Sequence, residues 1–166
     1  MRLKEQTSIF NMGDTSIRVK EVVPIYKQVL EVLQEHNRFY IAWDKHSQEK
    51  FYQSVLSEFH RIEKEEGDSL FGNLNRTETK GLDKRGRTLT NALVKVGFVD
   101  SNRKLSDVAK RYISGEDIEL DDLEKFFGLT DDNLTYFRQL LKLRVYDSET
   151  NYYFYNFRFA LAFLAR

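Results

Sequence analysis

Residues 84–115 constrain the fold of this chain more than any other stretch. Apolar side chains recur there at steps of three and four residues, namely Leu89, Ala92, Leu93 and Val96. This spacing predicts a helix with one apolar face, and places Arg87 and Asn91 on the opposite face. Gly97 follows, at the point where helices commonly end in a left-handed turn. We therefore expect an amphipathic helix that packs by one side only.

A small hairpin is expected directly after this helix. Residues 98–99 and 104–105 have the composition of two short strands, and a polar turn at 100–103 joins them. Ser106 can then cap a short helix that Gly115 ends. A basic-faced helix followed by a hairpin is the outline of a winged helix, in which the helix enters a major groove and the wing touches the DNA backbone.

Most of the remaining chain is predicted to be helical. Apolar stripes favour helices at 19–36, 51–62, 134–141 and 157–166, and a shorter helix at 121–127. Pro24 lies inside the first stripe, so that helix either starts near Val23 or bends there. Asp44 can cap the second of these helices, and Thr130 can cap the one that begins near residue 131. The segments at 1–16 and 67–81 have the composition of irregular chain.

Two aromatic segments need separate interpretation. Residues 39–43 are expected to connect the first two helices and to fill part of the core. Residues 152–155 could stack on bases, as aromatic side chains do in single-strand binders. The alternative is that they pack against Trp43 or against a continuation of the chain. The last helix has no stop signal, so we expect this sequence to be a fragment of a longer protein.

The predicted fold class is mainly α, a helical lobe followed by a winged helix-turn-helix unit and further helices. We expect an amino-terminal helical lobe at 1–66, a winged-helix DNA-binding lobe at 67–115 and carboxy-terminal helices at 116–166. A chain of 166 residues with 41% hydrophobic and 14% aromatic residues is large enough for a real core.

Charge is balanced overall but separated along the chain. The 26 basic side chains equal the 26 acidic ones, which excludes a globally basic nucleic-acid binder. Residues 68–111, however, hold ten bases and five acids, a net charge of +5. Residues 112–135 hold one base and eight acids, a net charge of −7. Any nucleic-acid binding must therefore come from the basic block, which coincides with the winged-helix candidate.

The candidate DNA-binding residues lie in this basic block. Arginine can pair with guanine and asparagine with adenine, while lysine and threonine hold phosphates. The candidates are Arg76, Lys80, Lys84, Arg85, Arg87, Thr88, Asn91, Lys95, Arg103 and Lys104. The alternative is that they are ordinary solvated residues of an inert helix and its neighbouring loops.

The sequence offers no cluster for hydrolytic or metal chemistry. No catalytic residue and no metal ligand is assigned, because the three histidines lie far apart and no cysteine is present. The one acid-x-lysine pair, Glu78 and Lys80, lies in a polar loop. Without cysteines, a signal core or a membrane-length apolar run, we expect a cytoplasmic protein with no membrane partner.

The segments at 83–100, 105–115, 136–142 and 157–164 together resemble one known family, the AlwI-type restriction endonucleases with their FokI-like and nicking relatives. Residues 83–100 resemble the family's arginine-rich helix followed by Gly-Phe-Val. Residues 105–115 look like its Leu-Thr-x-x-Gly-x-x-Leu segment, with Ala109 in place of the usual glycine. Residues 136–142 are similar to its Phe-Leu-Arg-Gln-Leu-Leu-Lys, and residues 157–164 stand where the next family helix belongs. The match covers residues 82–164.

This resemblance implies the DNA-recognition part of a type II restriction endonuclease. In the family, a carboxy-terminal Mg²⁺-dependent nuclease domain cuts the DNA, and that domain is not in this sequence. No cofactor is therefore expected here, and Mg²⁺ belongs to the missing domain. The residues that match the family's helix nearest to DNA are Arg85, Arg87 and Asn91. The expected partner is double-stranded DNA, bound by a monomer.

Two rival functions stay open at this point. The first is a winged-helix module for protein contacts, whose basic face is inert. The second is a small transcription regulator, which would bind a palindrome as a symmetric dimer.

Overall fold

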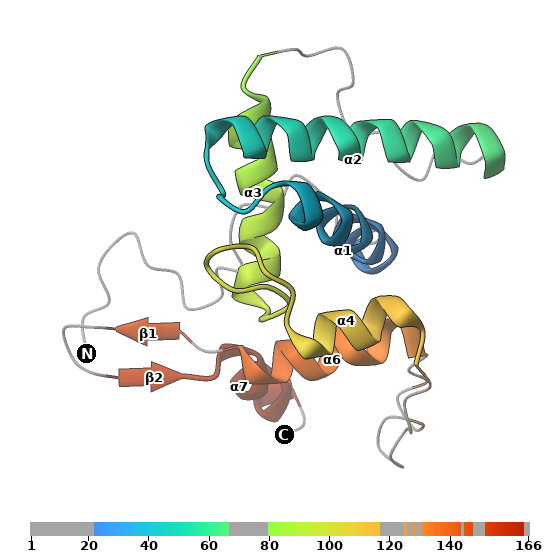
Figure 1. Cartoon of the computed structure of the whole chain (residues 1–166). Coiled ribbons are helices and arrows are strands. Elements are labelled where there is room, and N and C mark those ends of the chain that lie inside the picture. The colour runs from blue at the N-terminus through green and yellow to red at the C-terminus, as the bar shows by residue number, and fades with distance from the viewer. Residues whose placement is uncertain are drawn as a thin grey trace.

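The computed structural model describes residues 22–66, 80–116, 125, 128, 131–143, 145–147 and 152–164. This part of the chain is mainly helical, which confirms the predicted class at that level, and it also contains one small hairpin (Figure 1). Its elements in order are α1 (Val22–Phe39), α2 (Lys45–Glu66), α3 (Leu82–Lys95), α4 (Asp107–Ser114), α6 (Asp131–Lys142), β1 (Val145–Asp147), β2 (Tyr152–Phe154) and α7 (Asn156–Leu164).

The first two helices form where their apolar stripes predict them. Asp44 caps α2, because its Oδ1 accepts a hydrogen bond from the backbone N–H of Ser47 at 2.8 Å. The buried face of α2 contains Phe51, Val55 and Phe59, at the four-residue spacing that places side chains on one side of a helix. This face packs against the buried side of α1.

Helix α3 crosses the beginning of α2 at close range (Figure 1). Gly86 makes this approach possible: a β-carbon at that position would lie 2.5 Å from the backbone oxygen of Gln48. Leu89 and Leu93 continue the same side of α3 into the core. The contact fixes which side of α3 is covered, and its opposite side stays exposed.

A tight turn follows α3. Gly97 has a φ of +79°, which confirms the predicted left-handed end of the helix. Of the two short strands that we expected here, the structure has only one bridging pair, Val99 with Leu105. Ser106 then caps α4 by accepting a hydrogen bond from the N–H of Ala109, and Gly115 ends that helix with a φ of +70°.

One hydrophobic core joins α1, α2, α3, the turn and α4, and Leu134 of α6 is also fully buried. Helix α6 is attached by polar contacts too, since Nε2 of Gln139 donates to the backbone oxygen of Val96 at 2.9 Å. The core therefore continues across the predicted boundary at residues 66 and 67. The division into three parts stays a prediction.

The carboxy-terminal elements lie at one end of the molecule (Figure 1). β1 and β2 pair antiparallel, with Val145 opposite Phe154. Helix α7 contacts α6 through the rings of Phe157 and Phe137, 6.0 Å apart, and through a hydrogen bond from Nε of Arg158 to the backbone oxygen of Leu141. The short helix expected at 121–127 lies outside the described residues except for Lys125.

Both aromatic segments differ from the expectation. In the connector, Phe39 is 78% exposed and Ile41 is 87% exposed, so only part of it fills the core. The reason is that α1 continues to Phe39, which falls outside the buried stripe through Leu33 and His36. The run at 152–155 contributes strand β2, and the ring of Phe154 lies 5.2 Å from Phe159 of α7 rather than against Trp43.

Among the described residues, no helix is long and apolar enough to cross a bilayer.

Candidate nucleic-acid interface

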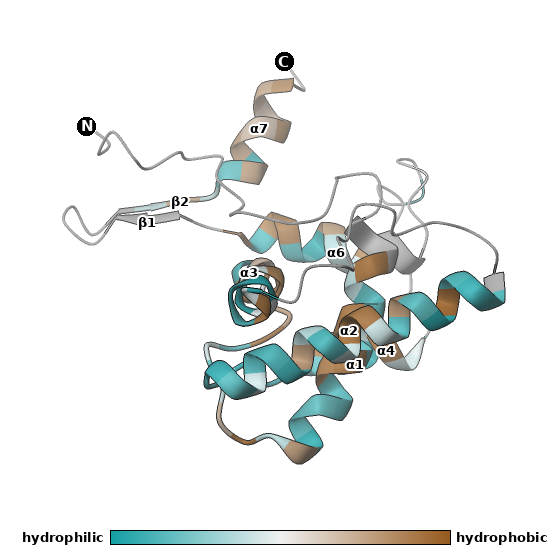
Figure 2. Cartoon of the chain, turned by 90° about the horizontal axis from the view of Figure 1, so that it is seen from above, coloured by the Kyte–Doolittle hydropathy of each residue, from teal (hydrophilic) through white to brown (hydrophobic). Residues whose placement is uncertain are grey.

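Helix α3 has two chemically different sides. Its buried residues are Gly86, Leu89, Thr90, Ala92 and Leu93. Figure 2 looks along the axis of this helix and shows hydrophobic residues on one side and hydrophilic residues on the other. The hydrophilic side is not covered by α1 or α2, so it can meet another molecule.

Four of the predicted DNA-binding residues form a stripe along this outer side. Lys84, Arg87, Asn91 and Lys95 are all exposed. At 100° per residue they span about 80° of the helix circumference, and about 16 Å of its length. None of the three cationic side chains forms an ion pair with any described residue. We call these four residues the α3 stripe.

The other predicted DNA-binding residues near α3 differ from one another in exposure and in their contacts. Lys80 is exposed and lies just before the helix begins, whereas Thr88 is half-buried at the edge of the stripe. Arg85 is half-buried and already has an interaction partner. Arg76 lies outside the described residues. The structure therefore brings Lys80 and Thr88 beside the stripe but separates Arg85 from it.

Arg103 was predicted to contact DNA from the wing, which requires an exposed side chain, but its side chain is buried. Its side chain is only 8% exposed, and its guanidinium is bonded on three sides. Nε donates to Oγ1 of Thr90 at 3.0 Å, Nη1 to the backbone oxygen of Ser101 at 2.7 Å, and Nη2 to Oδ1 of Asn91 at 2.6 Å. Arg103 thus ties the turn to α3 and holds a member of the stripe.

Further contacts fix Arg103 from the side of α1 and α2. The guanidinium carbon lies 5.6 Å from the centre of the Trp43 ring, within the range of a cation–π contact. The backbone oxygen of Arg103 accepts a hydrogen bond from Nδ2 of Asn37 at 2.8 Å. Burial lowers the pKa of the guanidinium, and the charge of Asp100 opposes that effect. An arginine nevertheless stays protonated, so Arg103 only donates.

Hydrogen bonds to the side chain of Asp100 give the turn after α3 a defined shape. Oδ1 of Asp100 accepts from the N–H groups of Asn102 and Lys104, both at 2.8 Å. Arg103 has a φ of +65°, the left-handed conformation that costs a non-glycine residue about 1 kcal/mol. Lys104 is half-buried beside this turn. The turn therefore presents little cationic surface of its own, because Arg103 is turned inward.

Sequence spacing did not point to two members of this arrangement. Asn37 and Trp43 support Arg103 from more than fifty residues away in the chain. No local pattern marks either residue, since an asparagine near the end of a helix and a single tryptophan are common surface and core residues. Only the packing of α1 and α2 against the turn brings them together.

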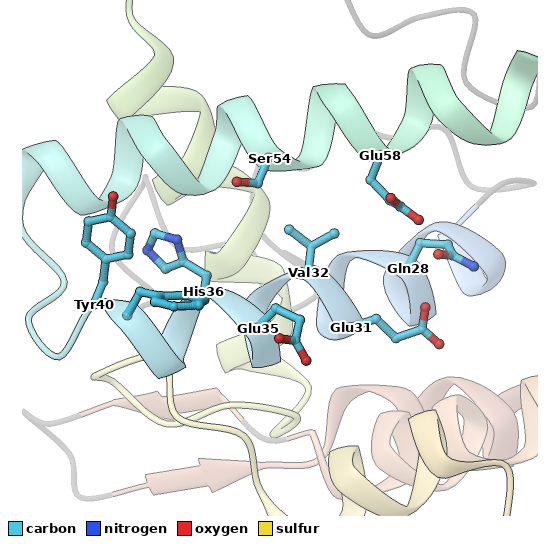
Figure 3. A pocket seen from close by; sticks show the side chains of 9 residues that line it. Gln28, Glu31, Val32, Glu35, His36, Tyr40, Ser54 and Glu58 are labelled. Atoms are coloured by element: carbon cyan, nitrogen blue, oxygen red, sulfur yellow. The ribbon is translucent and has the colours of Figure 1, made fainter.

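A second surface feature lies between α1 and α2. It is a groove of about 360 Å³, lined by Gln28, Glu31, Val32, Glu35, His36, Phe39, Tyr40, Ser54 and Glu58. Figure 3 shows its carboxylates along both helices, with α3 passing behind them. Burial and the nearby Glu58 raise the pKa of Glu31, while Lys27 lowers it. Two of its carboxylates are paired, Glu35 with Arg38 and Glu58 with Arg61, and the groove lies on the other side of α1 and α2 from α3 (Figure 3).

His36 forms the end of that groove next to the core. Its Nε2 lies 2.8 Å from Oγ of Ser47, and its ring stacks on Tyr40 at 4.3 Å. Burial, followed by the charge of Lys104, lowers its pKa to about 4. A neutral imidazole with one hydroxyl partner is a packing residue here. Across the described ranges, no group of three or more histidine, aspartate or glutamate side chains could hold a metal ion.

Comparison of the chain with protein-family models, with curated proteins and with solved structures finds no match. The resemblance to AlwI-type endonucleases therefore stays a prediction from the sequence. Of the surfaces described, the α3 stripe has the exposed cations that a nucleic acid would require.

Proposed function

We propose that this chain recognises double-stranded DNA with the α3 stripe, as the DNA-binding part of a type II restriction endonuclease. The observation that carries the proposal is the stripe itself: Lys84, Arg87 and Lys95 are exposed along one side of a helix, without ion pairs to described residues. Salt bridges neutralise many surface cations, so three cations on a single helix side without an ion pair among the described residues favour an anionic partner.

The dimensions of α3 suit a major groove. That groove is about 12 Å wide and admits one α-helix. Asn91 lies at the middle of the stripe, between Arg87 and Lys95. Its amide can therefore contact a base while the two cationic neighbours contact phosphates. Residues 80–116 hold nine bases and four acids, which supports long-range attraction of DNA to this region.

The elements around α3 support a winged helix-turn-helix interpretation of this proposal. Helix α2 crosses α3 and would act as the supporting helix. The turn at 100–104, closed by the pairing of Val99 with Leu105, would act as a very short wing. In such a wing Lys104 would approach phosphates, while the buried Arg103 would hold the turn against α3.

The endonuclease assignment depends on the resemblance alone. Residues 82–164 contain the segments that resemble AlwI-type enzymes. Under this proposal the chain binds DNA but does not cut it, and cleavage with Mg²⁺ belongs to a domain outside the sequence. DNA binding by the α3 stripe does not require this assignment.

A duplex titration tests the proposal. We expect the chain to bind a pool of random duplexes at low salt, with an affinity that falls steeply as salt rises. Replacing Lys84, Arg87 and Lys95 by glutamine should reduce the slope of log affinity against log salt by about 2 to 3. A matched control replaces Lys50 and Lys64 of α2 and Lys142 of α6, three exposed lysines of other helices, and should keep the slope. Equal slopes in both variants would contradict the proposal.

A protein-binding role is the second candidate, because the surface has exposed apolar residues. Phe39 and Ile41 lie at the connector, and Phe163 and Leu164 lie at the end of α7 with exposed fractions of 70% and 80%. Surface patches of this kind often mark protein contacts. The same titration separates the two candidates, since a protein-binding module would have neither duplex affinity nor a salt slope. A symmetric dimer on a palindrome would instead indicate a transcription regulator.

A further inference from the structure

The amide of Asn91 is held in place before any ligand arrives. It lies at the centre of the α3 stripe, and its Oδ1 accepts a hydrogen bond of 2.6 Å from Nη2 of Arg103. This bond is short because its donor is charged. An exposed asparagine normally rotates freely, so the bond changes what this side chain can offer to a partner.

The chemistry of arginine settles which atom of the amide faces inward. A guanidinium has five N–H donors and no acceptor, so only the amide oxygen can lie opposite Nη2. The nitrogen Nδ2 must therefore point away from Arg103. It donates to no described residue. Asn91 consequently presents two N–H donors to the outside, while its oxygen is engaged.

Arg103 cannot easily release this oxygen. Thr90, Ser101 and Trp43 hold its guanidinium from three other directions, and Asn37 holds its backbone. The single hydroxyl hydrogen of Thr90 is shared between the backbone oxygens of Gly86 and Arg87, so the lone pairs of Oγ1 can accept from Arg103. If the amide turned over, a largely buried guanidinium nitrogen would lose its partner, which is unfavourable.

We infer that Asn91 reads guanine rather than adenine, and that Arg103 is the positioning residue that sets this preference. The usual contact of asparagine with adenine needs both a donor to N7 and an acceptor for the N6 amino group. The Asn91 oxygen can accept two hydrogen bonds, but it is turned toward the buried Arg103 and so faces the protein rather than the groove. Guanine presents two acceptors in the major groove, N7 and O6, which match an outward amide that only donates. This inference rests on the proposed DNA-binding role of α3.

The test first selects preferred duplexes from a random pool with the full chain. It then finds the base pair whose preference disappears in Asn91→Ala. We expect guanine at that base pair, with about 10- to 100-fold discrimination against adenine. Replacing that guanine by 7-deazaguanine, which lacks the N7 acceptor, should remove most of the discrimination.

Two further variants separate positioning from folding. Asn91→Asp keeps an acceptor for Arg103 but has no N–H, so the guanine preference should disappear while the turn stays intact. Arg103→Met frees the amide, so the preference at the same base pair should move toward adenine. The position of the Asn91 side-chain amide signals in an NMR spectrum checks the bond to Arg103 without DNA, since they should shift in Arg103→Met.

Each remaining outcome counts against the inference. If the base pair read by Asn91 is adenine in the unmodified chain, or if Asn91→Asp keeps the preference, the inference is wrong while DNA binding by α3 stands. If the chain binds no duplex at low salt, the proposed function is wrong and this inference is wrong with it.

Discussion

Gly86 of α3 lies directly against the backbone oxygen of Gln48 in α2: a β-carbon at position 86 would be 2.5 Å from that oxygen. Real β-carbons essentially never come so close to a carbonyl. The distance shows that the crossing of α2 over α3 depends on the absence of a side chain at this one position.

The first prediction concerns this crossing. Gly86→Ala should lower the free energy of unfolding by about 1–3 kcal/mol, because α3 must move away from α2 to relieve the clash. Helix propensity alone predicts the opposite effect, because alanine in place of glycine would raise the free energy of unfolding by about 1 kcal/mol. Urea unfolding followed by circular dichroism measures the difference. Lys95→Ala, on the exposed side of α3, is the control and should change stability by less than about 0.5 kcal/mol.

The second prediction separates the backbone of Arg103 from its side chain. Arg103→Ala and Arg103→Gly both remove the bonds to Thr90, Ser101 and Asn91. Only alanine keeps the cost of a φ of +65°. Arg103→Gly should therefore be more stable than Arg103→Ala by about 1 kcal/mol, with both below the unmodified chain, as measured by urea unfolding. Equal stability of the two variants would contradict a left-handed turn at this residue.

The third prediction concerns pH. The pKa of His36 falls from 6.5 to about 4 in the folded chain, so the unfolded chain binds a proton there more readily. The contribution of this group to stability is therefore complete above pH 6.5 and is lost as the pH falls toward 4, by up to about 3 kcal/mol. His36→Gln keeps a polar partner for Ser47 but does not titrate. Its free energy of unfolding should depend less on pH between 6.5 and 4 than that of the unmodified chain.

The fourth prediction uses two lysines at opposite ends of α3. Lys84 lies in the first turn, near the positive end of the helix dipole, and Lys95 is the last residue, near the negative end. Lys84→Glu should raise the free energy of unfolding by about 0.5 kcal/mol, whereas Lys95→Glu should lower it by a similar amount. Thermal unfolding at low salt measures both.

The same pair tests DNA binding independently of stability. Each substitution changes the charge of the α3 stripe by the same amount, so both should weaken duplex binding and reduce its salt dependence. If Lys84→Glu is more stable but binds the duplex more weakly, Lys84 contributes to DNA binding and not to the stability of the fold. If duplex affinity followed stability instead, the lysines would act through folding alone.

The sequence by itself determined where the main helices form, but not the β1–β2 hairpin. The apolar spacing of Leu89, Leu93 and Val96 is a property of the chain alone, and it placed α3 and its outer stripe correctly. Caps such as Asp44 and Ser106 act on their own helix, so they too could be identified from neighbouring residues. The resemblance to a family and the function that it implies remain predictions.

Only the tertiary structure decided what Arg103 does. Its position in a polar turn after a basic helix predicted a residue open to DNA, yet its side chain is buried against Thr90, Asn91 and Trp43. The direction of a long side chain depends on a single backbone angle and on partners far away in the chain. For the same reason the outward donor of Asn91 could not be predicted: hydrogen-bond direction is a property of the packed neighbours, and periodicity contains no information about them.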